Sequence, residues 1–148
     1  MVMIKLLTIV ALSVSLFAND IITKESDFTV NETINNIKNI VKAKGFGVFA
    51  IIDHKANGKT VDMSLNETKV IIFGNPKVGT RLMQEDISIA LDLPLRMLVY
   101  KDTDGKVKLS YRDGSWIKSH HNLQSKNLTN KVNAGMDKIS DKARLKVN

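Results

Sequence analysis

Hydrophobic positions along this chain follow two patterns, one typical of amphipathic helices and one typical of buried strands. From residue 31 to 45, isoleucines and a valine recur every three or four positions, which predicts a helix with Asn31 as its cap. Residues 46–52 and 70–73 are short, continuous apolar runs, and such runs predict buried strands. Residues 27–30 predict one further short strand before the helix.

A second helix is predicted where the strand at 70–73 ends. Pro76 is tolerated in the first turn of a helix, and Asn75 before it is a suitable cap. Apolar residues then mark one helical face up to residue 91. Pro94 closes this helix, because the residue before a proline is pushed away from helical backbone angles.

The remaining elements define the fold class. Residues 95–100 and 107–111 flank a turn at 102–105, which predicts a hairpin, and a short helix is expected from Ser115. The order strand, helix, strand, strand, helix, strand, strand predicts an α+β fold. We expect a mostly antiparallel sheet of about five strands with two main helices on one face, plus a C-terminal helical extension.

The first 18 residues have the pattern of a secretory signal peptide. One lysine, Lys5, precedes an apolar run over residues 6–18 that ends on the small residue Ala18, before the polar residues Asn19 and Asp20. The run is shorter than the ~20 residues of a membrane-spanning helix. Cleavage near Ala18 and a periplasmic or secreted location in a bacterium are therefore expected, with an uncleaved N-terminal anchor as the alternative.

The C-terminal segment, residues 124–148, is basic and amphipathic. Its apolar residues fall on one helical face, with lysines between them: Leu128, Val132, Met136, Ile139, Ala143 and Val147. We expect a helix that packs on its own domain, on a second subunit, or on an anionic membrane or acidic partner surface. Gly135 predicts a break or fraying in it. The chain thus divides into a signal peptide (1–18), one α+β domain (19–123) and this extension.

Composition excludes several classes of chemistry. The 148 residues contain no cysteine, so disulfides, thiol nucleophiles and thiolate metal sites are excluded. The net charge is +7, but the excess lies mainly after Leu123 and few aromatic residues accompany it. Nucleic acid is therefore not expected as a partner.

One candidate site is the junction between the strand at 70–73 and the following helix. A helix start presents backbone N–H groups and a positive dipole end, which suit an anion or a carboxylate. Asn75, Lys77, Gly79 and Thr80 are the candidate ligand-binding residues here, and Arg81 adds charge. The alternative is that these residues serve only the backbone geometry of the helix start.

A second candidate site uses histidine. His54 follows Asp53 at the end of a predicted strand, and His120 and His121 lie in the short helix after Ser115. If that helix returns to the same end of the sheet, Asp53, His54 and His121 converge as metal ligands or as an acid–base pair. We further expect His54 and the turn at 75–80 to line one pocket. The alternative for each histidine is a hydrogen-bonded structural role.

Several phrases of the sequence resemble the family called domain of unknown function 302. They cover roughly residues 27–123 and are Gly45-Phe46, Ile52-Asp53-His54 with Ala56 and Gly58, Phe73-Gly74-Asn75-Pro76 with Gly79-Thr80 and Leu82-Met83, Ala90-Leu91-Asp92-Leu93-Pro94-Leu95, Asp104-Gly105 with Val107 and Tyr111, and His121 with Leu123. The resemblance implies a fold like the one that the periodicity predicts. It implies no reaction, and it identifies no cofactor.

Three functions remain open from the sequence. The first is a small ligand-binding or interaction module of the bacterial envelope without catalytic activity, whose ligand is a small anion or a metal. The second is an enzyme or metal-binding protein that uses His54 and His121 near the turn at 75–80. The third is a structural homodimer built across an open sheet edge. The absence of a complete catalytic signature favours the first.

Overall fold

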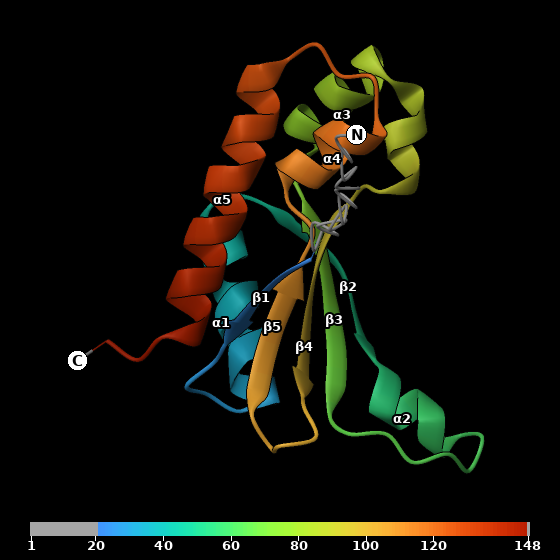
Figure 1. Cartoon of the computed structure of the whole chain (residues 1–148), viewed down its shortest axis with the longest axis vertical. Helices are drawn as coiled ribbons and strands as arrows, with labels where there is room; N and C mark the ends of the chain where they lie inside the picture. The colour runs from blue at the N-terminus through green and yellow to red at the C-terminus, as the bar shows by residue number, and fades with distance from the viewer. Residues whose placement is uncertain (1–20, 148) are drawn as a thin grey trace, which may run out of the picture.

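A five-stranded sheet forms the centre of the computed structural model, which describes residues 21–147 (Figure 1). Its strands, all paired antiparallel, lie in the order β1-β5-β4-β3-β2. They are β1 (Ile22–Glu25), β2 (Gly47–Asp53), β3 (Thr68–Gly74), β4 (Leu95–Lys101) and β5 (Val107–Tyr111). The helices are α1 (Val30–Ala43), α2 (His54–Lys59), α3 (Pro76–Glu85), the 3-10 helix η1 (Ile87–Leu91), α4 (Gly114–His120) and α5 (Lys126–Arg144). The predicted α+β class and the five-stranded antiparallel sheet are confirmed.

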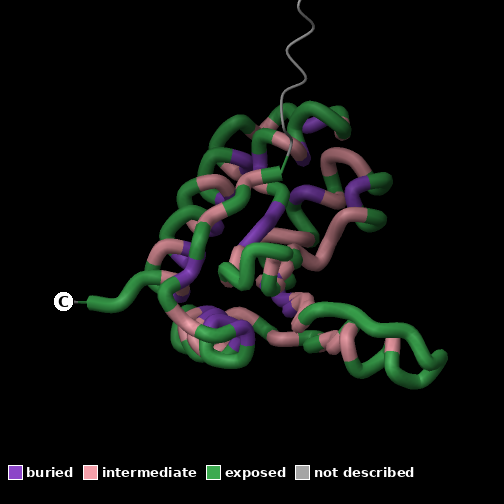
Figure 2. Tube along the Cα trace, turned by 60° about the horizontal axis from the view of Figure 1, so that its bottom comes forward, coloured by how far each residue is buried: buried purple, intermediate pink, exposed green. Residues whose placement is uncertain are grey.

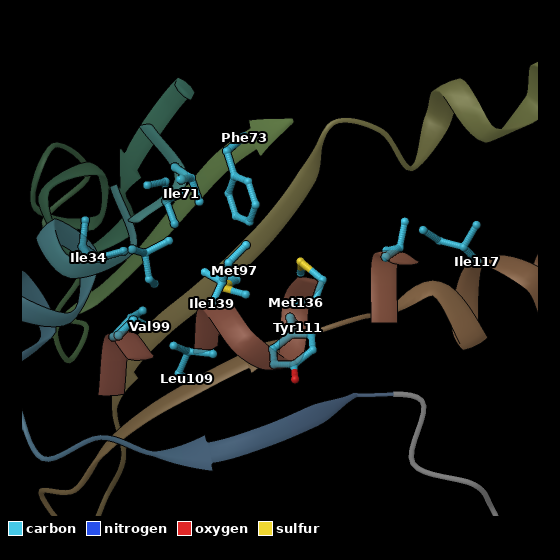
Figure 3. Close-up of a cluster of buried hydrophobic side chains, with 14 of the residues drawn as sticks. Ile34, Ile71, Phe73, Met97, Val99, Leu109, Tyr111, Ile117, Met136 and Ile139 are labelled. Carbon is cyan, nitrogen blue, oxygen red and sulfur yellow. The ribbon is translucent and has the colours of Figure 1, made fainter. Parts of the chain in front are cut away.

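The hydrophobic core lies between the sheet and the helices α1 and α5. Strand residues such as Ile71, Met97 and Leu109 are fully buried, and their side chains point toward Ile34 of α1 and Met136 of α5 (Figure 3). The sequence predicted two helices on one face, and the second of them is α5 rather than the helix after β3. That helix lies beyond the end of the sheet, because it starts directly where β3 ends (Figure 1).

The first strand and the start of α1 differ from their predicted positions because of local capping. Residues 27–30 do not form a strand, and β1 lies earlier in the chain. Thr29 caps α1 in place of Asn31: its hydroxyl accepts the Glu32 backbone N–H at 3.2 Å, and Glu32 Oε2 accepts the Thr29 backbone N–H at 2.9 Å. This reciprocal capping box satisfies two donors that a helix start otherwise leaves free.

The predicted helix 76–91 divides in two. Asn75 caps α3 as expected, but α3 ends at Glu85 and Asp86 takes an extended conformation with φ −146°. The Asp86 carboxylate then accepts the Ser88 backbone N–H at 2.9 Å and starts η1. An aspartate side chain that accepts a hydrogen bond from the backbone two residues further on competes with continuation of the helix. Hydrophobic periodicity contains no information on this bond, so it did not predict the break.

The last helix is continuous and belongs to the core. α5 runs from Lys126 to Arg144 through Gly135 without the predicted break. It packs on α1 and α4 of its own domain, and its buried face includes Val132, Met136 and Ile139. The helix and the sheet therefore bury a common apolar interior, and the buried residues are the purple stretches of the trace in Figure 2.

The sheet face opposite α1 and α5 carries a row of half-buried apolar side chains. Ile52 pairs with Val70, Val70 with Leu98, and Leu98 with Ser110. Cross-strand partners share a face of the sheet, so Ile52, Val70 and Leu98 form one apolar row across β2, β3 and β4, which ends at the buried Ser110 of β5. Among residues 21–147, no helix is both long and apolar enough to cross a membrane.

Candidate ligand-binding site

A cavity of about 470 Å³ lies between the end of the sheet, α3 and α5. Its wall is mainly apolar and comes from four regions of the chain. The lining residues are Phe46, Phe49, Phe73, Gly74, Asn75, Pro76, Val78, Gly79, Thr80, Leu82, Met83, Ala90, Leu93, Pro94, Leu95, Lys131, Val132, Gly135, Met136 and Ile139. The volume falls in the range of about 300–1,000 Å³ that is usual for small-molecule sites.

The turn at 75–80 lines this cavity, but its hydrogen bonds differ from those that an anion site needs. The Asn75 side chain accepts the Lys77 backbone N–H at 2.9 Å. The Asn75 carbonyl accepts the N–H groups of Val78 and Gly79, both at 3.0 Å. The donors at this helix start therefore already have partners within the chain, which fits the geometric alternative. Lys77 is exposed and does not line the cavity.

Gly135 of α5 keeps part of the cavity open. A Cβ built at this position meets no atom within 4 Å, so the helix presents bare backbone to the space. A glycine inside a helix costs about 1 kcal/mol relative to alanine. Because the space beside Gly135 is empty, packing does not require a glycine here, although the glycine makes the helix less stable.

His54 does not share the cavity with the turn at 75–80. β2 and β3 are antiparallel, so the start of β2 pairs with the end of β3 (Gly47 with Gly74) and Asp53 pairs with Lys69. The end of β2 and the end of β3 consequently lie at opposite ends of the sheet. The prediction of a shared pocket is wrong for this reason, and His54 lines a different groove.

Asp53 is occupied by local contacts. Its carboxylate accepts the Ala56 backbone N–H at 2.9 Å and caps α2, and it pairs with Lys69 at 3.1 Å. The Ala56 hydrogen bond, followed by the Lys69 contact, lowers the pKa of the Asp53 carboxyl. These contacts explain the Asp53 position without a metal.

His121 is held inside a hydrogen-bonded cluster. Its Nε2 lies 2.7 Å from Asp92 Oδ2 and its Nδ1 lies 2.9 Å from the Ser88 hydroxyl. Only 6% of the side chain is exposed. Asp53, His54 and His121 do not converge, and in the part of the chain that the structure describes no three His, Asp or Glu residues are placed to hold a metal ion. For His121, the structural role is the one that the geometry fits.

The same cluster fixes the connection between α4 and α5. Asp86 Oδ2 accepts the Asn122 backbone N–H at 2.9 Å. Glu85 Oε2 accepts the backbone N–H groups of Gln124 and Ser125 at 2.9 and 3.0 Å. Hydrogen bonds from Ser125 lower the pKa of Glu85, and those from Ser88 and Asn122 lower the pKa of Asp86. These two carboxylates thus position the start of α5, and with it one wall of the cavity.

A second groove of about 410 Å³ lies over the row of apolar side chains on the sheet. His54, Asp92, Arg96, Arg112 and Trp116 contribute its polar and aromatic lining. Sequence reasoning did not select the two arginines. For Arg96, the signal was the alternation of the strand at 95–100, in which Arg96 precedes the buried Met97 and so belongs to the other face.

Comparison with known proteins connects this architecture to a family. The family model described as "Domain of unknown function DUF302" matches residues 22–143. The sequence had suggested that the segment after residue 123 is an extension of the domain. The match includes α5, so this segment belongs to the family fold.

A solved structure has the same fold. The crystal structure of an uncharacterized conserved protein DUF302 from Bacillus stearothermophilus has a TM-score of 0.69 and 19% sequence identity. The structural alignment covers 86% of this chain and 97% of the Bacillus stearothermophilus chain.

Curated relatives have a different description. Proteins named "Fluoride-specific ion channel FluC 1" from Brucella suis biovar 1 (strain 1330) and Brucella abortus biovar 1 (strain 9-941) are each 41% identical over 109 residues. The aligned region is 74% of this chain but only 43% and 40% of the relatives. The chain thus spans about two fifths of the length of these curated relatives.

Proposed function

The chain belongs to the DUF302 family, and from this premise we propose that it is an exported bacterial envelope protein whose domain binds a small apolar ligand. The binding site is the cavity between the end of the sheet, α3 and α5. The ion-channel function named for the Brucella relatives is not transferred to this chain, because the chain spans about two fifths of their length.

One observation carries the binding proposal: a cavity of about 470 Å³ with a mainly apolar wall in which a mid-helix glycine faces empty space. The cavity is open to solvent on one side, so its apolar wall is in contact with water. An apolar molecule that covers this wall removes apolar surface from water, which is favourable by about 25 cal/mol per Å².

The geometry also supports an apolar ligand rather than a small anion. The sequence offered a small anion at the turn as one interpretation and backbone geometry as the other, and the N–H donors of Lys77, Val78 and Gly79 are already bonded. Lys131 is the one charged residue in the cavity wall. We therefore expect the apolar body of the ligand to provide most of its affinity. The alternative function, an enzyme or metal protein based on His54 and His121, lacks the convergence that it needs.

The export part of the proposal rests on the sequence. The signal-peptide pattern occupies residues 1–18, which lie outside the described residues, and the family match starts only at residue 22. Mass spectrometry of the secreted or periplasmic protein should find an N-terminus at Asn19 or within a few residues of it. A full-length chain retained in the membrane would contradict export.

The binding proposal is tested with a neutral probe whose fluorescence rises in apolar surroundings, N-phenyl-1-naphthylamine. The variant Gly135→Leu places a side chain into the empty space, and we expect it to weaken probe binding about tenfold or more, the equivalent of losing one well-buried apolar group. Ala134→Leu is the matched control, because Ala134 is exposed on the same helix and does not line the cavity.

The controls decide between the cavity and nonspecific binding. Circular dichroism must show that both variants remain folded. If Gly135→Leu binds the probe as the unmodified protein does, or if Ala134→Leu loses binding equally, the cavity is not the binding site.

A further inference from the structure

The second groove is lined by two arginines, Arg96 in β4 and Arg112 directly after the end of β5. β4 and β5 pair Met97 with Tyr111 and Leu98 with Ser110. One step further along the same register places Arg96 opposite Arg112. Both side chains are exposed and both line the groove.

These arginines lack an anionic partner within the described chain. No carboxylate of residues 21–147 lies within 4.0 Å of either guanidinium. Asp92 also lines the groove, but its Oδ2 is engaged by His121 Nε2 at 2.7 Å. Like charges directly opposite each other on a sheet destabilise it, and an anion between them removes that repulsion.

The surroundings hold one arginine in place. The Arg112 guanidinium lies 4.4 Å from the centre of the Trp116 ring. A guanidinium stacked on an aromatic ring keeps its planar fork of donors, which matches carboxylate and phosphate oxygens. A group that is already oriented loses less entropy when it binds.

The floor beside the arginines is apolar. Leu98 and Ile72 line the groove next to Arg96, and Val70 and Ile52 continue the row toward the far side of the sheet. A positive pair at one side and an apolar strip at the other match a molecule with one anionic end and an apolar body.

We propose that this groove binds an organic anion with an apolar body. Its carboxylate or phosphate oxygens lie between Arg96 and Arg112, and its apolar part lies along Leu98 and Ile72. The groove is distinct from the cavity at α5, with which it shares the lining residue Leu95, and the occupant is a free molecule in solution rather than a lipid in a bilayer.

The test uses the mature protein with decanoate and decyl phosphate as probes and decanol as the neutral match. Calorimetry measures affinity, and fluorescence of Trp116, the single tryptophan of the chain, reports on occupancy of the groove. Arg96→Gln and Arg112→Gln should each weaken binding of both anions about tenfold or more, because a charge-assisted hydrogen bond is lost. Arg81→Gln, which removes one exposed positive charge outside the groove, should leave binding unchanged.

Several outcomes overturn the proposal. Equal binding of decanol and decanoate, or unchanged decanoate binding in Arg96→Gln, would remove the role of the arginine pair. Fluoride binding as tightly as decanoate would remove the role of the apolar body. Binding only to anionic vesicles would assign the surface to a membrane, and a dimer that buries Arg96 would assign it to a second copy.

Failure of this site is distinguishable from failure of the cavity. Gly135→Leu should leave decanoate binding unchanged if the anion occupies the groove. Loss of decanoate binding in Gly135→Leu, together with unchanged binding in Arg96→Gln, would place the anion in the cavity and refute this inference.

Discussion

Replacing Gly135 by alanine should make the domain more stable, although most substitutions in a packed protein destabilise it. Two contributions determine the size of the effect. Alanine is favoured over glycine in a helix interior by about 1 kcal/mol. The added methyl group meets no atom within 4 Å, so no overpacking term opposes this gain.

Burial of the new methyl group adds little, because it enters an open cavity. Full burial of one methyl-sized group would contribute about 0.8 kcal/mol, and only part of that is available here. The expected gain in the free energy of unfolding is therefore about 1–1.5 kcal/mol. For a domain of this length it corresponds to a rise in Tm of about 3–5 °C.

Urea unfolding followed by Trp116 fluorescence measures this gain as a shift in the midpoint at constant m-value. Gly45→Ala is the matched control, because a Cβ there also meets nothing within 4 Å but φ is +75°. That left-handed conformation costs a residue with a Cβ about 1–2 kcal/mol, so this variant should be less stable. A Gly135→Ala midpoint equal to or below that of the unmodified protein would refute an open space beside the helix.

Two further predictions concern the contacts of α5 with α4 and with β1. Gly114→Ala should lower the free energy of unfolding by about 3 kcal/mol in the same urea assay, because its Cβ would lie 2.2 Å from the Thr129 carbonyl oxygen; a loss below about 1 kcal/mol would mean that α4 and α5 separate easily. Lys24→Met should cost about 1–2 kcal/mol at neutral pH, since Lys24 Nζ lies 2.5 Å from Asp137 and 3.0 Å from Asp141. The Lys24 hydrogen bond lowers the pKa of Asp141, so this stabilisation is complete above the unfolded pKa of about 3.9 and is lost as the pH falls through the folded pKa. The difference between Lys24→Met and the unmodified protein should therefore shrink in urea titrations below about pH 4, and a constant difference would contradict the assignment.

Sequence periodicity predicted those elements whose signals are local and consistent. The apolar runs at 46–52 and 70–73 became β2 and β3, and Asn75 with Pro76 marked the start of α3. The errors arose where a side chain hydrogen bond competes with the pattern. Thr29 turned a predicted strand end into a helix cap, and Asp86 divided a predicted helix.

The candidate sites required information that periodicity does not contain. Gly79 and Thr80 do line a cavity, but the engaged N–H groups behind them depend on how Asn75 bonds in three dimensions. His54 was placed at the wrong end because two consecutive strands were compared without their direction. The pair Arg96 and Arg112 depends on strand register, which the sequence alone left open.

The edge strand β1 joins the beginning of the domain to its end. It pairs with β5, the Asp27 backbone N–H donates to the Arg144 carbonyl at 2.8 Å, and the Lys146 N–H donates to the Asp27 carboxylate at 3.0 Å. The strand that pairs with β1 is therefore complete only when Tyr111 has been made, and the partners of Asp27 follow only at the end of α5. Such long sequence separations slow folding, and we expect the nascent chain to stay incompletely folded throughout its synthesis.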